Sequence, residues 1–67
     1  MILDPFSVYA KGEELLRRQL GALSPRHLRA IIRTYDLVGG PNANLEVLDE
    51  TEMIAIIVTA ARTRLGA

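Results

Sequence analysis

The chain has no cysteine and a single histidine, His27, among its 67 residues. Without cysteine it can form neither disulfides nor thiolate metal sites, and one imidazole cannot supply the ligands of a zinc site. We therefore expect no metal and no cofactor. The lack of cysteine is compatible with a reducing compartment, and we expect a cytoplasmic location.

Long apolar runs are also missing. The longest, from Met53 to Val58, is far shorter than the ~20 residues that a bilayer-spanning helix needs. The first residues have neither a basic region nor a long apolar one, so they do not resemble a signal peptide. We expect no membrane partner.

The residues that are present suit one small folded domain. The hydrophobic fraction of 49% is enough for a core, although a chain of this size buries only about 60% of its unfolded surface. So short a chain offers little room for a pocket that could desolvate a carboxyl group and raise its pKa. His27 also lacks a complete serine–base–acid set near it in the sequence. We expect that the chain is not an enzyme and binds no small-molecule substrate.

The first predicted element is an amphipathic helix over about residues 5–22. Asp4 followed by Pro5 is a typical helix start, since the carboxylate can accept from free amides and proline there loses no needed donor. Gly12 could divide this helix, because glycine in a helix interior costs about 1 kcal/mol relative to alanine. The apolar stripe consists of Phe6, Tyr9, Leu16, Leu20 and Leu23, with Glu13 interrupting it.

Two more helices are predicted, over about residues 25–35 and 50–65. Ser24 before Pro25 repeats the start signal of the first helix. Residues 36–48 contain the strongest helix breakers in the chain and are expected to form an extended loop tacked onto the core. The β-branched run at 56–59 would also suit a strand, but the length and end signals favour a helix. The expected fold is all-α, with three helices.

Charge is unevenly distributed along the chain, although the formal net charge is zero. Arg26, Arg29 and Arg33 fall on one face of the second predicted helix, and the guanidinium fork suits phosphate. Arg17 and Arg18, near the preceding turn, extend this candidate nucleic-acid-binding site. Five acids then follow with no base between them: Asp36, Glu46, Asp49, Glu50 and Glu52.

Two plainer interpretations of the arginines stay open. An amphipathic helix needs a solvated face, and arginine is a good helix former. The acidic segment 46–52 could also fold back and pair with the arginines, although surface pairs contribute only about 0–1 kcal/mol each.

The third predicted helix is apolar over more than half of its circumference, whereas packing on one side needs a stripe of only ~100°. In a small three-helix domain no helix is fully central. We therefore predict a second possible role, as a protein-interaction or homodimerisation module that uses Ile54, Ile57 and Val58.

The spacing of apolar residues from Leu23 to Val58 resembles the helix-extended-loop-helix modules of the SAP and Rho N-terminal type. The chain also resembles short three-helix segments of uncharacterised bacterial proteins. The resemblance implies DNA binding through basic residues at the loop and the start of the following helix. This chain has Asp49, Glu50 and Glu52 there, so only the scaffold and the basic face of helix 25–35 carry over.

Overall fold

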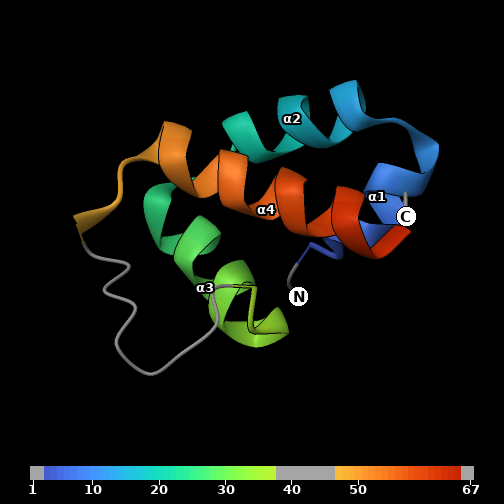
Figure 1. Cartoon of the computed structure of the whole chain (residues 1–67). Coiled ribbons are helices and arrows are strands. Elements are labelled where there is room, and N and C mark those ends of the chain that lie inside the picture. Colours follow the sequence, from blue (N-terminus) through green and yellow to red (C-terminus); the bar gives the residue numbers. More distant parts are fainter. Residues whose placement is uncertain (1–2, 38–46, 66–67) are drawn as a thin grey trace.

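The computed structural model describes residues 3–37 and 47–65, which contain α-helices and no strand. The all-α class is confirmed, but the described residues form four helices instead of the three predicted. Figure 1 shows α4 running across the molecule with α2 above it and α3 below it. The helices are α1 (Pro5–Lys11), α2 (Glu13–Gly21), α3 (Pro25–Tyr35) and α4 (Glu50–Leu65).

Gly12 is where the single helix predicted over 5–22 proves wrong. Its φ of 153° and ψ of 135° end α1 and begin α2, and side chains with a Cβ rarely adopt this positive φ. The chain changes direction there, so that α1 packs against both α2 and α4. Glu13 interrupts the predicted stripe because it is the first residue of a new helix.

The start of α1 follows the sequence prediction. The Asp4 Oδ1 accepts hydrogen bonds from the backbone N–H groups of Phe6 at 3.0 Å and Ser7 at 3.3 Å. These two amides have no acceptor within the helix, so the carboxylate satisfies donors that would otherwise need water.

The starts of α3 and α4 differ from each other. Ser24 occupies the N-cap position of α3, but its side chain caps no backbone amide and its Oγ lies 2.7 Å from His27 Nδ1. At α4, Glu52 N–H donates to Asp49 Oδ1 at 2.8 Å, and Asp49 N–H donates to Glu52 Oε1 at 3.2 Å. The reciprocal capping box therefore belongs to α4.

α3 ends where the sequence prediction placed its end. Asp36 adopts φ 50°, in the left-handed region that Asp tolerates better than most residues, and Leu37 N–H donates to Ile32 O at 3.0 Å. Most of the predicted loop, residues 38–46, lies outside the described residues. At its far end Val47 is 72% exposed, while Leu48 packs partly against the core.

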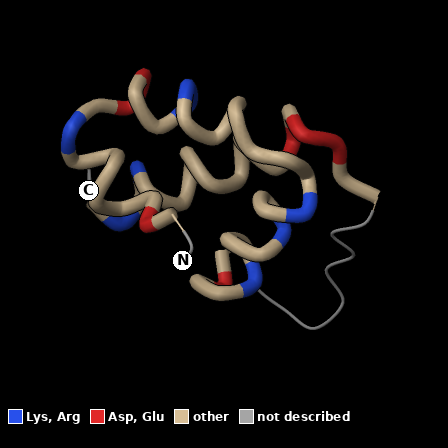
Figure 2. Tube along the Cα trace, turned by 180° about the vertical axis from the view of Figure 1, so that it is seen from behind, with Lys and Arg blue, Asp and Glu red and all other residues tan. Residues whose placement is uncertain are grey.

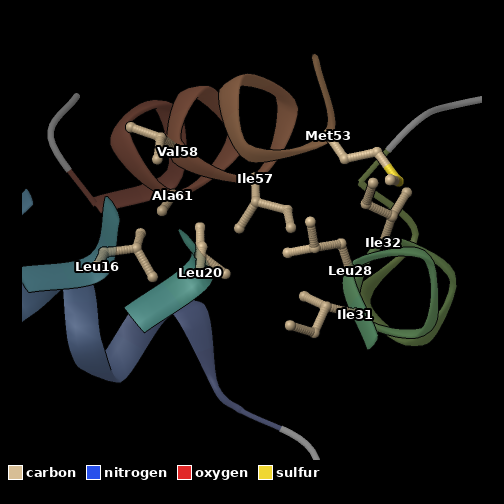
Figure 3. Packing of buried hydrophobic residues seen from close by; sticks show 9 residues of the cluster. All are labelled: Leu16, Leu20, Leu28, Ile31, Ile32, Met53, Ile57, Val58 and Ala61. Atoms are coloured by element: carbon tan, nitrogen blue, oxygen red, sulfur yellow. The ribbon is translucent and has the colours of Figure 1, made fainter. Parts of the chain in front are cut away.

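The core gathers around α4, which packs against α1, α2 and α3. Figure 3 shows Ile57 and Ala61 directed from α4 toward the leucines of α2 and α3. The helix predicted over 50–65 is confirmed, and the competing strand at 56–59 is excluded by α4. The buried apolar side chains are Leu16, Leu20, Leu28, Ile31, Ile32, Met53, Ile57, Val58 and Ala61.

Candidate functional site

The arginines of α3 lie on the side of that helix that does not enter the core. Arg26 and Arg33 are exposed and Arg29 is half-buried, whereas Leu28, Ile31 and Ile32 on the opposite side are buried. Because positions i, i+3 and i+7 share one helix face, the helical backbone gathers the three guanidinium groups on one side. The structure therefore brings together the three residues that sequence reasoning selected.

Pairing of this face with the acidic segment, one of the two plainer interpretations, is not seen among the described residues, which include 47–52 of that segment. Within residues 3–37 and 47–65 no ion pair joins Arg26, Arg29 or Arg33 to a carboxylate. Figure 2 shows the basic positions of α3 as separate blue segments along the helix. The acidic start of α4 lies toward the same end of the molecule as the start of α3 in both views, and negative charge on that side lowers the positive potential of the arginine face.

Arg17 and Arg18 are placed differently. Both are exposed on α2, and the Arg17 Nε lies 3.3 Å from the Glu13 Oε2 one turn earlier. α4 packs against both α2 and α3, and Figure 2 shows the basic segment of α2 apart from those of α3. Arg17 is thus engaged within its own helix, and the pair does not continue the arginine row of α3.

Glu13 also forms an ion pair with Arg62 that the sequence did not predict. Its Oε1 accepts a hydrogen bond from Arg62 Nη2 at 2.7 Å and another from Arg62 Nε at 3.2 Å. The two residues are 49 positions apart, so no local pattern in the sequence could reveal the contact. The contact joins the start of α2 to the last turns of α4.

The pKa values of this pair are shifted in opposite directions. Hydrogen bonding from Arg62 lowers the pKa of Glu13, partial burial opposes that effect, and Arg17 adds to the lowering. Hydrogen bonding to Glu13 raises the pKa of Arg62. Both groups are therefore held in their charged forms at neutral pH.

The predicted interface on the last helix has to be redefined. Ile57 and Val58 are 0% exposed inside the monomer, so their side chains cannot meet a partner in this structure. Ile54 is partly buried against the same core. The sequence prediction assumed that no helix is fully central, but the break at Gly12 supplies a fourth helix, and α4 has three neighbours. This packing accounts for most of the wide apolar face.

Two hollows mark the surface of the described residues. One of about 560 Å³ runs along α4 beside Leu37. A second of about 800 Å³ lies where the segment before α1, the end of α2 and α3 meet, and His27 is on its wall. The charged or titratable lining residues are Arg64 in the first hollow and Asp4 and His27 in the second.

A search for metal ligands in the described part of the chain finds no group of three or more His, Cys, Asp or Glu side chains suitably placed. Among the same residues, no helix combines the length and apolar character needed to cross a bilayer.

Comparisons with known proteins return no relatives. No family model matches the chain, and no curated protein and no solved structure gives a significant match. The resemblance to helix-extended-loop-helix modules therefore stays a prediction.

Proposed function

We propose that this chain is a non-catalytic interaction module that binds the phosphate backbone of nucleic acid weakly through Arg26, Arg29 and Arg33. The observation that carries the proposal is the arrangement of three guanidinium groups on the outer face of α3, with no ion pair to a described carboxylate. Planar guanidinium groups donate two hydrogen bonds at once to phosphate oxygens.

The spacing of the arginines suits a nucleic-acid strand. Arg26 and Arg33 are seven residues apart on α3, which corresponds to ~10 Å along a helix axis. One strand of duplex DNA carries a phosphate every ~3.4 Å along its axis, so about three phosphates pass over that length. Such contacts would recognise the backbone and would carry little sequence information.

Binding of this kind should be weak and sensitive to salt. Three phosphate contacts give a slope of log K against log salt concentration of about −3, and we expect a Kd of ~10⁻⁴ M or weaker at low salt. The carboxylates of Asp36, Glu50 and Glu52 repel phosphate and reduce the affinity further.

The proposed type of module is helix-extended-loop-helix, with α3 and α4 as its two helices. The resemblance supports nucleic acid as the ligand, but the acidic first turn of α4 moves the contacts from the second helix to α3. Asp49, Glu50 and Glu52 would repel phosphate there.

A matched pair of double variants tests the proposal. Arg26→Gln with Arg33→Gln removes two charges from α3, and Arg17→Gln with Arg18→Gln removes two charges from α2. Each is titrated against a fluorescent DNA duplex and a single strand at several salt concentrations. We expect the α3 variant to lose about two units of the salt slope and ~10-fold or more in affinity at low salt, and the α2 variant to lose much less.

Two results would contradict the proposal. One is a wild-type chain with no salt-dependent binding to either probe. The other is an equal loss of affinity in both double variants, because that would indicate a general response to net charge and not a site on α3.

A further inference from the structure

A shallow groove runs along the side of α4 that faces away from the core. Figure 1 shows α4 in front of α2, with no described helix in front of it. Ile56 is only partly buried there, and Leu65 at the end of the helix is 49% exposed. The groove is lined by Leu37, Ala55, Ile56, Thr59, Ala60, Thr63 and Arg64.

Opposite charges stand toward the two ends of α4. Glu52 lies in the first turn and Arg64 in the last turn, and both are exposed. The capping bond to Asp49 N–H uses the Oε1 of Glu52. The Arg64 guanidinium carbon lies 5.1 Å from the centre of the Phe6 ring, a cation–π contact that occupies no carboxylate. Each charge can therefore take a further partner.

We propose that this groove is the interface between two copies of the chain, with their α4 helices antiparallel across a two-fold axis that meets the outer side of α4 at the level of residue 58, whose own side chain faces the core. Glu52 and Arg64 are each six residues from Val58, or ~9 Å along the helix. A two-fold axis there sets Glu52 of each copy opposite Arg64 of the other copy. The surface is thus complementary to itself in charge, as an isologous interface requires.

The shapes along the same row are complementary as well. Ile56 and Ala60 are each two residues from Val58, so the same axis places the larger side chain of one copy against the smaller side chain of the other. Glu52, Ile56, Ala60 and Arg64 follow one another at intervals of four residues. Rows with this spacing interdigitate when two helices cross at about 50°.

The charges also fix the orientation of the pair. A parallel arrangement would bring the two Glu52 side chains together and the two Arg64 side chains together, and like charges in contact disfavour that geometry. The interface stands apart from the arginine face of α3, so this proposal does not depend on nucleic-acid binding.

The test measures the molecular mass of the full chain by sedimentation equilibrium from ~1 µM to ~1 mM. We expect the wild type to show a concentration-dependent monomer–dimer equilibrium. Thr59→Arg, which places a charge at an exposed groove position, should weaken the dimer by ~100-fold or more. Thr34→Arg adds the same charge to an exposed position on α3 and should leave the equilibrium unchanged.

Charge reversal tests the antiparallel pairing. Glu52→Arg alone and Arg64→Glu alone should each weaken the dimer by ~10-fold, and the two together should restore it to within about threefold of the wild type. Glu50→Arg is the matched control for the first turn of α4, and helicity by circular dichroism is recorded for each variant.

The proposal is overturned if the wild type stays monomeric at ~1 mM, or if it dimerises and Thr59→Arg has no effect. It is also overturned if the double reversal fails to restore a dimer that both single reversals weaken. Thr59→Arg keeps the test valid even if Glu52→Arg disturbs the start of α4.

Discussion

α3 and α4, the two longest helices among the described residues, use their surfaces in opposite ways. α3 buries one face, with Leu28, Ile31 and Ile32 in the core, and presents arginines on the other. α4 packs against the other three described helices, and its buried and partly buried apolar residues together cover more than half of its circumference. The narrow apolar stripe belongs to the peripheral helix and the wide one to the central helix. The width of an apolar face thus reports how many neighbours a helix has, before it reports any external partner.

The strongest way to sharpen this comparison is to truncate neighbouring isoleucines of α4. Ile57→Ala should lower the free energy of unfolding by about 2–4 kcal/mol, because it leaves a cavity at a fully buried site. Ile56→Ala should cost less than half as much, since that side chain is only partly buried. Urea denaturation measures both, and Ile57→Val, expected to cost about 0.5–1.5 kcal/mol, serves if the alanine variant does not fold. Equal losses at positions 56 and 57 would contradict the described packing.

A second prediction concerns the break that gives α4 its third neighbour. Gly12→Ala should destabilise the fold by about 1–3 kcal/mol, through the backbone alone, because an added Cβ at Gly12 meets no atom within 4 Å. Gly21→Ala is the matched control. Position 21 lies at the end of α2 with equal space around it, and alanine there should be neutral or stabilise by up to about 1 kcal/mol. A stabilised Gly12→Ala variant would show that α1 and α2 merge into one helix.

The helix starts provide a third prediction. Asp49→Ala should cost about 1–2 kcal/mol, because it removes half of the reciprocal box at α4. Ser24→Ala should cost less than about 0.5 kcal/mol, since the Ser24 hydroxyl contacts the His27 ring and caps no amide of α3. Thermal unfolding of the two variants makes the comparison. Equal losses would mean that the Ser24 hydroxyl does cap α3 in solution.

The smallest expected effect is the pH dependence of the stability that the Glu13–Arg62 ion pair contributes between α2 and α4. The pKa of Glu13 is lower in the folded chain than in the unfolded chain, so its stabilisation is complete above its ordinary pKa of about 4.5. This contribution is lost as the pH falls through the lowered folded value. The stability difference between wild type and Glu13→Gln should therefore shrink as the pH is reduced from 7 toward 3. A difference that is constant over this range would contradict the ionic contact with Arg62.

Local signals in the sequence predicted much of the fold. Apolar spacing and end signals predicted helices over about residues 25–35 and 50–65, and the structure has helices at Pro25–Tyr35 and Glu50–Leu65. The break at Gly12 could be foreseen only as an alternative, because a glycine is tolerated inside many helices. The helix breaks at Gly12 because the break lets α1 pack against α4, and that stabilisation depends on residues far along the chain.

In the candidate site too, features set by helix periodicity were predictable and features set by tertiary packing were not. The arginines of α3 share a face because helix periodicity puts them there, so Arg26, Arg29 and Arg33 follow from the sequence. The burial of Ile57 and Val58 does not follow from the sequence, because it depends on how many helices surround α4. The bond between Glu13 and Arg62 likewise depends on tertiary structure alone.

The position of α4 in the core also affects when this chain can fold. Synthesis proceeds from the N-terminus, and α4 follows the three helices that it covers. Until its residues are available, Leu16, Leu20 and Leu28 lack the helix that seals them from water. We therefore expect nascent chains that stop before residue 50 to remain without a stable core, and the arrival of α4 to start folding in one cooperative step.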